Sequence, residues 1–142
     1  MTTIEIRGHP GMGPEVTGPA LVASDNFSAR YDLDCKAGVF SRPSHALYGE
    51  NYVGKVLILN AAKGGVATSW MLYNMAAEGM APLALLLNRA NPIMAQAAAF
   101  AGMAFTDRFE IDITKAIRTG DQVQVNARDG LIRITPLQDD AR

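Results

Sequence analysis

Cysteine is nearly absent from this sequence. Cys35 is the one cysteine among 142 residues, so the chain forms no internal disulfide. A metal or iron–sulfur site built on cysteine ligands needs several thiolates, which this chain does not have. We therefore expect no metal site in this chain, and any such centre that its function needs must come from another polypeptide.

An excess of charge of one sign is also lacking. Thirteen Lys and Arg residues stand against fourteen Asp and Glu residues, which gives a formal net charge of −1. Proteins that bind nucleic acids or anionic lipids usually display a basic patch, and this sequence has no run of basic residues. We expect neither a nucleic acid nor a membrane as a partner.

Long apolar runs are missing as well. No stretch approaches the roughly 18 apolar residues of a membrane-spanning helix. The first residues do not form the basic and then apolar segment of a signal peptide. We therefore expect a cytoplasmic protein without a membrane span.

The remaining composition is that of a globular protein. Hydrophobic residues make up 49% of the chain and charged residues 19%, which argues against disorder. The length suits one compact domain, and no repeat or biased linker divides the sequence. We expect a single domain over residues 1–142.

Several short segments have the patterns of strands. Residues 3–7 alternate apolar and polar side chains, as a half-buried strand does, and the glycine and proline cluster at 8–14 is expected to end it. Residues 19–23 form a short apolar run, and the polar stretch to about residue 36 is expected to be mostly loop. Residues 55–59 form a continuous aliphatic run, which indicates a strand covered on both faces in a parallel or mixed sheet.

The aliphatic run at 55–59 is the first element of a longer unit of alternating strands and helices. A glycine-containing loop follows it, and Thr68 or Ser69 is expected to cap a helix that continues to about Glu78 and is closed by Gly79. Residues 82–87 have the pattern of a second buried strand. The order predicts a strand, a glycine loop, a helix and a second strand.

The end of the chain predicts a second helix and a hairpin. Pro92 suits the first turn of a helix through Phe100, with Gly102 as its stop. Beyond a short segment at 111–118, residues 120–134 contain two alternating runs joined by an Asp-Gly turn, which predicts a β-hairpin. The fold class is therefore α/β, with a mixed sheet, flanking helices and a C-terminal hairpin.

The glycine loop is the most informative place for chemistry. Gly64 and Gly65 allow the backbone to approach a ligand closely, and the helix that follows has unpaired amide donors and a partial positive charge at its start. Lys63 adds a full charge, so the loop suits a bound carboxylate or phosphate. The alternative is that both glycines only make a tight strand-to-helix connection. The loop has neither the P-loop ending nor the three glycines of a dinucleotide site.

Few other residues suggest chemistry. Arg89 follows the second buried strand and could face the same anion or only cover a helix terminus. His9 lies in a turn, and His45 lies among polar and aromatic residues, where structural hydrogen bonding is favoured over catalysis. A catalytic triad is not predicted, since sequence cannot supply its geometry. The methionines near the two helices are expected to fill the core.

The order of these segments resembles the swivel domain of aconitase X. The resemblance runs from about residue 5 to residue 135 and depends on order and spacing more than on one motif. The matching segments are residues 16–22, Asp34 with Gly38, and residues 45–49, 54–57, 63–69, 79–84 and 91–92.

This resemblance implies a swivelling β/β/α fold with a mixed or barrel-like sheet. It also implies the small subunit of a two-subunit hydro-lyase, a heterodimer active only with its large partner. In this family the large part carries an iron or iron–sulfur centre, and the small part closes over it. Family members dehydrate cis-3-hydroxy-L-proline or mevalonate 5-phosphate, and we expect a small hydroxy acid, with cis-3-hydroxy-L-proline as the first candidate.

The sequence departs from the family at one important position. The family loop has a serine associated with proton abstraction, and Gly65 stands there in an ungapped match. Ser69, or Thr68, is expected to act as the base instead, with Lys63, Gly64, Gly65 and Arg89 binding the substrate. The alternatives are a branch with another chemistry or a non-catalytic subunit that stabilises or gates a larger enzyme. A shared active site also predicts a partly apolar face on this subunit, to which the alanines and methionines of the two helices would contribute.

Overall fold

Three parallel strands form the centre of the protein. The structure is a computed structural model that describes residues 3–26, 32–34, 36–61, 66–90 and 92–137, without the side chains of residues 66–69. Strand β6 (Val56–Ala61) pairs in parallel with β7 (Ala84–Arg89), and β7 pairs in parallel with β8 (Ala104–Asp107). The first four residues of both β6 and β7 are buried, which confirms the two predicted strands covered on both faces.

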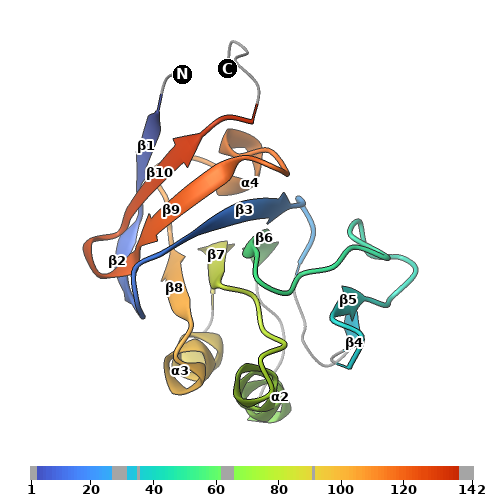
Figure 1. Ribbon diagram of the computed structural model, residues 1–142. Coiled ribbons are helices and arrows are strands. Elements are labelled where there is room, and N and C mark those ends of the chain that lie inside the picture. The colour runs from blue at the N-terminus through green and yellow to red at the C-terminus, as the bar shows by residue number, and fades with distance from the viewer. Residues whose placement is uncertain (1–2, 27–31, 35, 62–65, 91, 138–142) are drawn as a thin grey trace.

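The sheet curls almost into a barrel. Its eight strands follow the order β1-β10-β9-β3-β6-β7-β8-β2. Strand β1 (Ile4–Arg7) pairs with β10 (Leu131–Thr135) at one end of this order, and β2 (His9–Met12) pairs with β8 at the other end. Because Gly8 alone separates β1 from β2, this segment joins the two ends of the sheet (Figure 1).

Strand β3 (Val16–Val22) joins the parallel and antiparallel halves. It runs parallel to β6 and antiparallel to β9 (Gln122–Asn126). Strands β9 and β10 form an antiparallel hairpin through the 3-10 turn η1 (Ala127–Asp129). The mixed sheet and the C-terminal hairpin are therefore confirmed.

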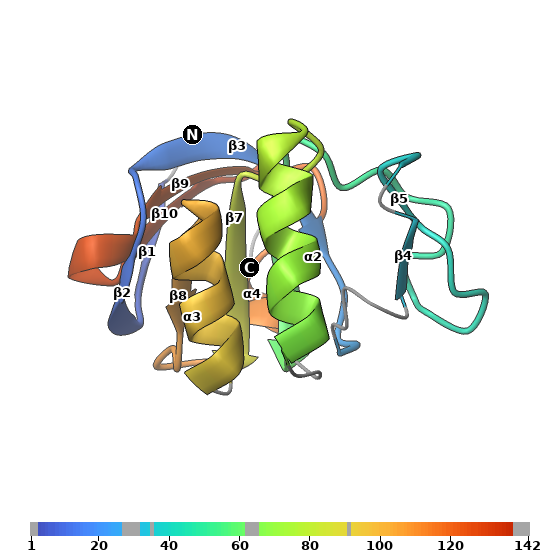
Figure 2. The ribbon, with the colours of Figure 1, turned by 90° about the horizontal axis from the view of Figure 1, so that it is seen from below.

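Helices α2 (Val66–Ala77) and α3 (Pro92–Ala101) lie side by side on one face of the sheet (Figure 2). Both end as expected, because Gly79 and Gly102 adopt left-handed conformations with φ of 72° and 69°. The amide of the residue after each glycine reaches back to a helix carbonyl, at 2.8 Å after α2 and 3.0 Å after α3.

The predicted start of the first helix is wrong. Helix α2 begins at Val66, so Thr68 and Ser69 lie within its first turns rather than before it. Nothing in the Val66-Ala67 pair breaks a helix, and the polar cap preference used for the prediction is only a local tendency. The predicted start of the second helix at Pro92 is confirmed.

Alternation along the strands separates two apolar cores. Leu57 and Leu59 of β6 pack with α2 and α3 in the first core. Val56 and Ile58 face the opposite way, into a second core enclosed by the antiparallel strands and α4 (Ile113–Ala116). The central strands are buried on both faces because each face has its own cover.

Several short elements differ from the sequence-based predictions. The glycine and proline cluster at 8–14 contains β2, where an added Cβ at Gly11 would overlap with the Phe105 carbonyl oxygen. Strand β8 was not predicted because Ala104–Asp107 neither alternates apolar and polar residues nor forms an aliphatic run. The stretch expected to be loop contains β4 (Leu33–Asp34), which pairs with β5 (Val39–Phe40).

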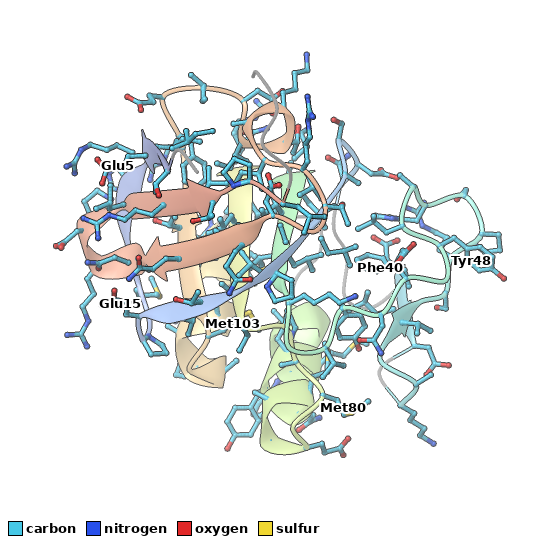
Figure 3. All side chains as sticks on the ribbon, turned by 45° about the horizontal axis from the view of Figure 1, so that its top comes forward. Glu5, Glu15, Phe40, Tyr48, Met80 and Met103 are labelled. Carbon is cyan, nitrogen blue, oxygen red and sulfur yellow. The ribbon has the colours of Figure 1, made fainter. Side chains whose placement is uncertain are left out.

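Strands β4 and β5 lie to one side of the sheet, nearer to α2 than to α3 (Figures 1 and 2). Phe40 of β5 is fully buried in the first core, whereas Tyr48 points away from the body at the outer end of this region (Figure 3). In the described part of the chain, no helix has the length and apolar character needed to cross a membrane.

Candidate functional site

The candidate site lies at the carboxyl ends of β6 and β7. Ala61 at the end of β6 is the register partner of Arg89 at the end of β7. Leu57 and Leu59 face the helices, and alternation therefore places Ala61 and Arg89 on this helix-covered side. Ligands of open parallel sheets commonly bind outside the carboxyl ends of the strands. Arg89 thus stands where the chain leaves β6 towards α2.

Arg89 is exposed at this edge. Among the residues that the structure describes, no carboxylate lies within ion-pair distance of its guanidinium group. Its charge is therefore not neutralised by a described acidic side chain. A guanidinium group at such a place can bind a carboxylate or a phosphate with two parallel hydrogen bonds.

The structure covers the other predicted site residues only in part. Lys63, Gly64 and Gly65 lie outside the described residues. The backbone of Thr68 and Ser69 belongs to the first turns of α2, while their side chains are not described. The first four amides of an α-helix have no partner within the helix, so the start of α2 adds donors to the edge that carries Arg89.

A chain of polar side chains crosses this edge and was not predicted. The Asn60 amide donates to Asn26 Oδ1 at 3.4 Å. The Asn88 amide donates to Asn60 Oδ1 at 3.0 Å and to Asp112 Oδ1 at 2.8 Å. Asn88 Oδ1 accepts from the backbone amide of Ile113 at 2.9 Å, so its amide group is fully engaged.

Asp112 caps α4 and connects this polar chain to Thr114 and Ser24. Its Oδ1 accepts from the Thr114 hydroxyl at 2.7 Å and from the Thr114 backbone amide at 3.0 Å. Thr114 in turn lies 3.2 Å from the Ser24 hydroxyl. The hydrogen bonds from the Thr114 and Asn88 side chains hold the pKa of Asp112 below its ordinary value, since they favour the ionised carboxylate.

A second polar cluster surrounds His45, which is almost fully buried. His45 Nδ1 accepts from the Leu47 backbone amide at 3.0 Å, and Nε2 donates to the Asn26 carbonyl at 2.8 Å. Its ring stacks on Phe40 with centroids 4.7 Å apart. This geometry assigns the neutral tautomer protonated on Nε2 and confirms the structural role predicted for His45.

Asp25 links the His45 cluster to the strand edge. Partial burial raises the pKa of Asp25, but hydrogen bonds from the backbone amides of Asn26 and Ala46, with the charge of nearby Arg42, hold it below its ordinary value. The Asp25 and Asp32 carboxylates each lie 3.8 Å from His45 Nε2. Arg42 Nε lies 2.6 Å from the buried Asp32 carboxylate. The cluster therefore places two carboxylates beside the buried imidazole, with Arg42 against one of them.

His9 and the methionines also had predicted positions. His9 is exposed on β2, where its Nδ1 lies 3.2 Å from the Pro10 carbonyl oxygen. Met75, Met94 and Met103 are buried, which confirms their predicted place in the core, whereas Met71 and Met80 are only partly buried.

The described residues do not fit a metal site. Within the described ranges, no group of three His, Cys, Asp or Glu side chains is placed to hold a metal ion. Cys35 lies outside those ranges. We derive no metal chemistry from the described part of this chain.

The arrangement can bind an anion but carries no described acid–base pair. Arg89 and the helix amides are donors for a carboxylate or phosphate. Arg89 was predicted from the sequence, whereas Asn60 and Asn88, the first polar residues after each aliphatic run, were not. Their shared position directly after Leu59 and Leu87 was a signal that both asparagines meet at one edge.

Comparisons with known proteins agree with this architecture. A sequence profile of the aconitase X swivel domain matches residues 5–134, so the chain belongs to the aconitase X swivel domain family. The crystal structure of Thermococcus kodakaraensis aconitase X has the same fold, with a TM-score of 0.86 at 23% identity over 93% of this chain and 98% of that chain.

Two relatives are small subunits of phosphomevalonate dehydratase. The protein from Methanocella arvoryzae is 36% identical over 132 residues, which are 93% of this chain and 100% of the relative. The protein from Methanothrix thermoacetophila is 34% identical over 125 residues, which are 88% of this chain and 90% of the relative. This chain is accordingly the small subunit of an aconitase X-type dehydratase, and the predicted hydro-lyase class is confirmed.

Proposed function

We propose that the carboxyl edge of β6 and β7 binds the acidic group of a small hydroxy acid and completes an active site shared with a large aconitase X-type subunit. The pairing of Ala61 with Arg89 carries this proposal, because it brings an exposed cation to the strand end from which the glycine loop departs. Lys63, Gly64 and Gly65 are proposed to bind the same anion from the loop.

The proposed chemistry is the removal of water from a β-hydroxy acid. A base takes the proton on the carbon next to the carboxylate, and the hydroxyl leaves from the neighbouring carbon, so that one water is released. Arg89 assists by neutralising the carboxylate, which makes the adjacent C–H bond more acidic. Ser69 is the proposed base and Thr68 the second candidate. The positive end of α2 favours a negatively charged oxygen at its first turns.

The substrate that the relatives favour is phosphomevalonate. Both compared small subunits carry that name, and two cations with helix amides suit a molecule that has a phosphate as well as a carboxylate. The substrate that was expected first from the sequence, cis-3-hydroxy-L-proline, is not confirmed and becomes the second candidate. It has the same β-hydroxy acid unit but a single anionic group.

The partner supplies what this chain lacks. We propose a heterodimer in which the large subunit holds the iron or iron–sulfur centre of the family, because the described residues here fit no metal. The centre would provide Lewis-acid chemistry for the leaving hydroxyl. Location in the cytoplasm stays a prediction.

The test is reconstitution of the two subunits. We expect the purified chain alone to be inactive and the pair to convert mevalonate 5-phosphate into a product lighter by one water, as measured by mass spectrometry. Assay of cis-3-hydroxy-L-proline under the same conditions decides between the two substrates. Turnover by the isolated small subunit would refute the shared site.

A non-catalytic gating role is the alternative, and Gly65 in place of the family's serine is the observation that favours it. Replacing Ser69→Ala in the reconstituted pair separates the two roles. Loss of a true base should lower kcat by on the order of a hundredfold or more, whereas KM changes little. Thr68→Ala, made in parallel, tests the second candidate base. Full turnover in both variants would favour gating.

A further inference from the structure

The two surface helices carry no charged residue. Helix α2 has twelve residues and α3 has ten, and neither contains Asp, Glu, Lys or Arg, although charged residues make up 19% of the chain. A surface helix usually presents charged side chains to water on the face opposite its core. Both helices have an outer face nonetheless, because they cover the sheet from one side only (Figure 2).

Aromatic side chains occupy this outer face instead. Trp70 is 65% exposed, Tyr73 49% and Phe100 68%. The Trp70 and Tyr73 rings pack edge to face, with centroids 6.3 Å apart. Tyr73 and Phe100, from different helices, line a shallow cavity of about 240 Å³ floored by alanines. The exposed apolar face expected from the sequence is present, but aromatic residues form it, while three of the methionines are buried.

We propose that this aromatic helix face, defined by Trp70, Tyr73 and Phe100, is the docking surface for the large subunit of the dehydratase. The choice of occupant rests on the two-subunit function proposed above. An uncharged surface suits a permanent partner, because burying it desolvates no ion, and exposed Trp and Tyr are the residues that most often anchor interfaces.

Continuity with the candidate site favours the large subunit. Trp70 directly follows Ser69 in α2, so the aromatic helix face begins at the strand edge that carries Arg89 and runs along α2 and α3. A subunit that contacts the aromatic helix face therefore also reaches the edge where the shared site is proposed.

The exposed area argues against a second copy of this chain. An aromatic side chain carries on the order of 200 Å² of surface, so the three rings leave roughly 350 Å² accessible at these exposed fractions. A specific interface takes about 800 Å² from each partner. Two copies joined only by these rings would bury less than this area. A larger subunit that also contacts the strand edge would bury more area on this chain than the rings alone provide.

The test measures the affinity between the two subunits. Phe100→Glu places a charge in the aromatic helix face, and we expect it to raise the Kd for the large subunit at least about 30-fold, as for an interface hot spot. The matched control is Leu137→Glu, since Leu137 is 66% exposed but follows β10, which lies away from α2 and α3 (Figure 1). It should leave the Kd within about twofold of the wild-type value.

A second variant and a folding measurement complete the design. Phe100→Leu keeps an apolar side chain and should weaken binding only a few-fold. Thermal unfolding of each isolated variant checks that the fold survives, as the exposure of Phe100 predicts. Wild-type affinity of Phe100→Glu, or equal weakening by Leu137→Glu, would overturn the proposal.

Two further outcomes separate this proposal from others. If the isolated chain is a dimer that Phe100→Glu dissociates, while affinity for the large subunit is unchanged, the face joins two copies and the proposal is wrong. If Phe100→Glu breaks the complex but both Ser69→Ala and Thr68→Ala leave turnover intact, the docking surface is supported and the proposed catalytic role of this chain fails.

Discussion

The antiparallel strands and the paired helices present very different surfaces to solvent. On the strand side, Glu5 and Arg133 are directly opposite each other in β1 and β10, with Arg133 Nε 2.9 Å from Glu5 Oε2. Glu15 accepts a hydrogen bond from Gln124 of β9 at 2.7 Å, and both labelled glutamates lie on this part of the molecule (Figure 3). On the other side, helices α2 and α3 carry exposed aromatic rings and contain no charged residue.

This difference distinguishes a surface suited to solvent exposure from one suited to contact with another protein. Paired charges on exposed strands keep a surface hydrated and discourage pairing with other chains. Exposed rings on helices without charge leave apolar area in contact with water, and such patches mark interaction sites. The protein therefore has one face suited to solvent and one suited to a partner.

The largest expected effect on stability distinguishes the buried side of the helix pair from its exposed side. Leu72→Ala removes a fully buried side chain from the first core and should lower the free energy of unfolding by about 3 kcal/mol. Phe100→Ala on the outer side should change it by no more than about 0.5 kcal/mol in the isolated chain. Chemical denaturation of both variants measures the difference. Equal losses would mean that the ring of Phe100 belongs to the core.

A smaller effect is expected at the polar strand edge. Asp112→Ala removes the cap of α4 and should cost about 1 kcal/mol of unfolding free energy at pH 7. Because the folded-state pKa of Asp112 is lowered, its ionised form stabilises the fold above the ordinary carboxyl pKa of about 4. This stability is lost as the pH falls through the folded-state pKa.

The free energy of unfolding of wild type and of Asp112→Ala is measured by chemical denaturation between about pH 3 and about pH 7, a range that includes the ordinary carboxyl pKa of about 4. The stability gap should be constant near neutrality and narrow towards the acidic end. Lys115→Ala, on the same short helix, serves as a control for changes that leave the cap in place. A gap that widens on acidification would contradict the assigned role of the carboxylate.

The smallest effect is expected on the charged strand face. Glu5 and Arg133 are both about half exposed, so their ion pair should contribute at most about 0.5 kcal/mol. A double-mutant cycle with Glu5→Gln and Arg133→Gln measures this coupling. It should decline further at high salt, because ions screen exposed charges. A coupling that persists in concentrated salt would show that this face is less hydrated than its composition indicates.

Much of the central unit could be predicted from the sequence. The aliphatic run at 55–59 and the segment at 82–87 are too apolar for a half-exposed strand, and both became buried parallel strands. Gly79 and Gly102 marked the helix ends because a left-handed residue there strongly favours glycine. The hairpin followed from alternation around an Asp-Gly turn.

Other features could not be predicted because they depend on distant partners. Strand β2 forms where Gly11 lets the chain approach Phe105, and β8 has neither an alternating nor a continuous apolar pattern. Arg89 was recognised from its position after a strand, but its register with Ala61 is a property of the sheet. The position of Asn60 and Asn88 after the aliphatic strands was a local signal, but their hydrogen bonds to Asn26 and Asp112 join residues far apart in sequence, which local patterns do not reveal.

Local composition by itself determined which segments are apolar on both faces, where the helices stop and that the chain has too few cysteines for a site with several thiolate ligands, since each depends on side-chain type and near neighbours. Tertiary structure alone decided that residues 4–12 close the sheet, that Arg89 pairs in register with Ala61 at the end of β6, and that the aromatic rings face outwards. The physical reason is that strand register and helix packing satisfy hydrogen bonds and bury area between segments that no local pattern relates.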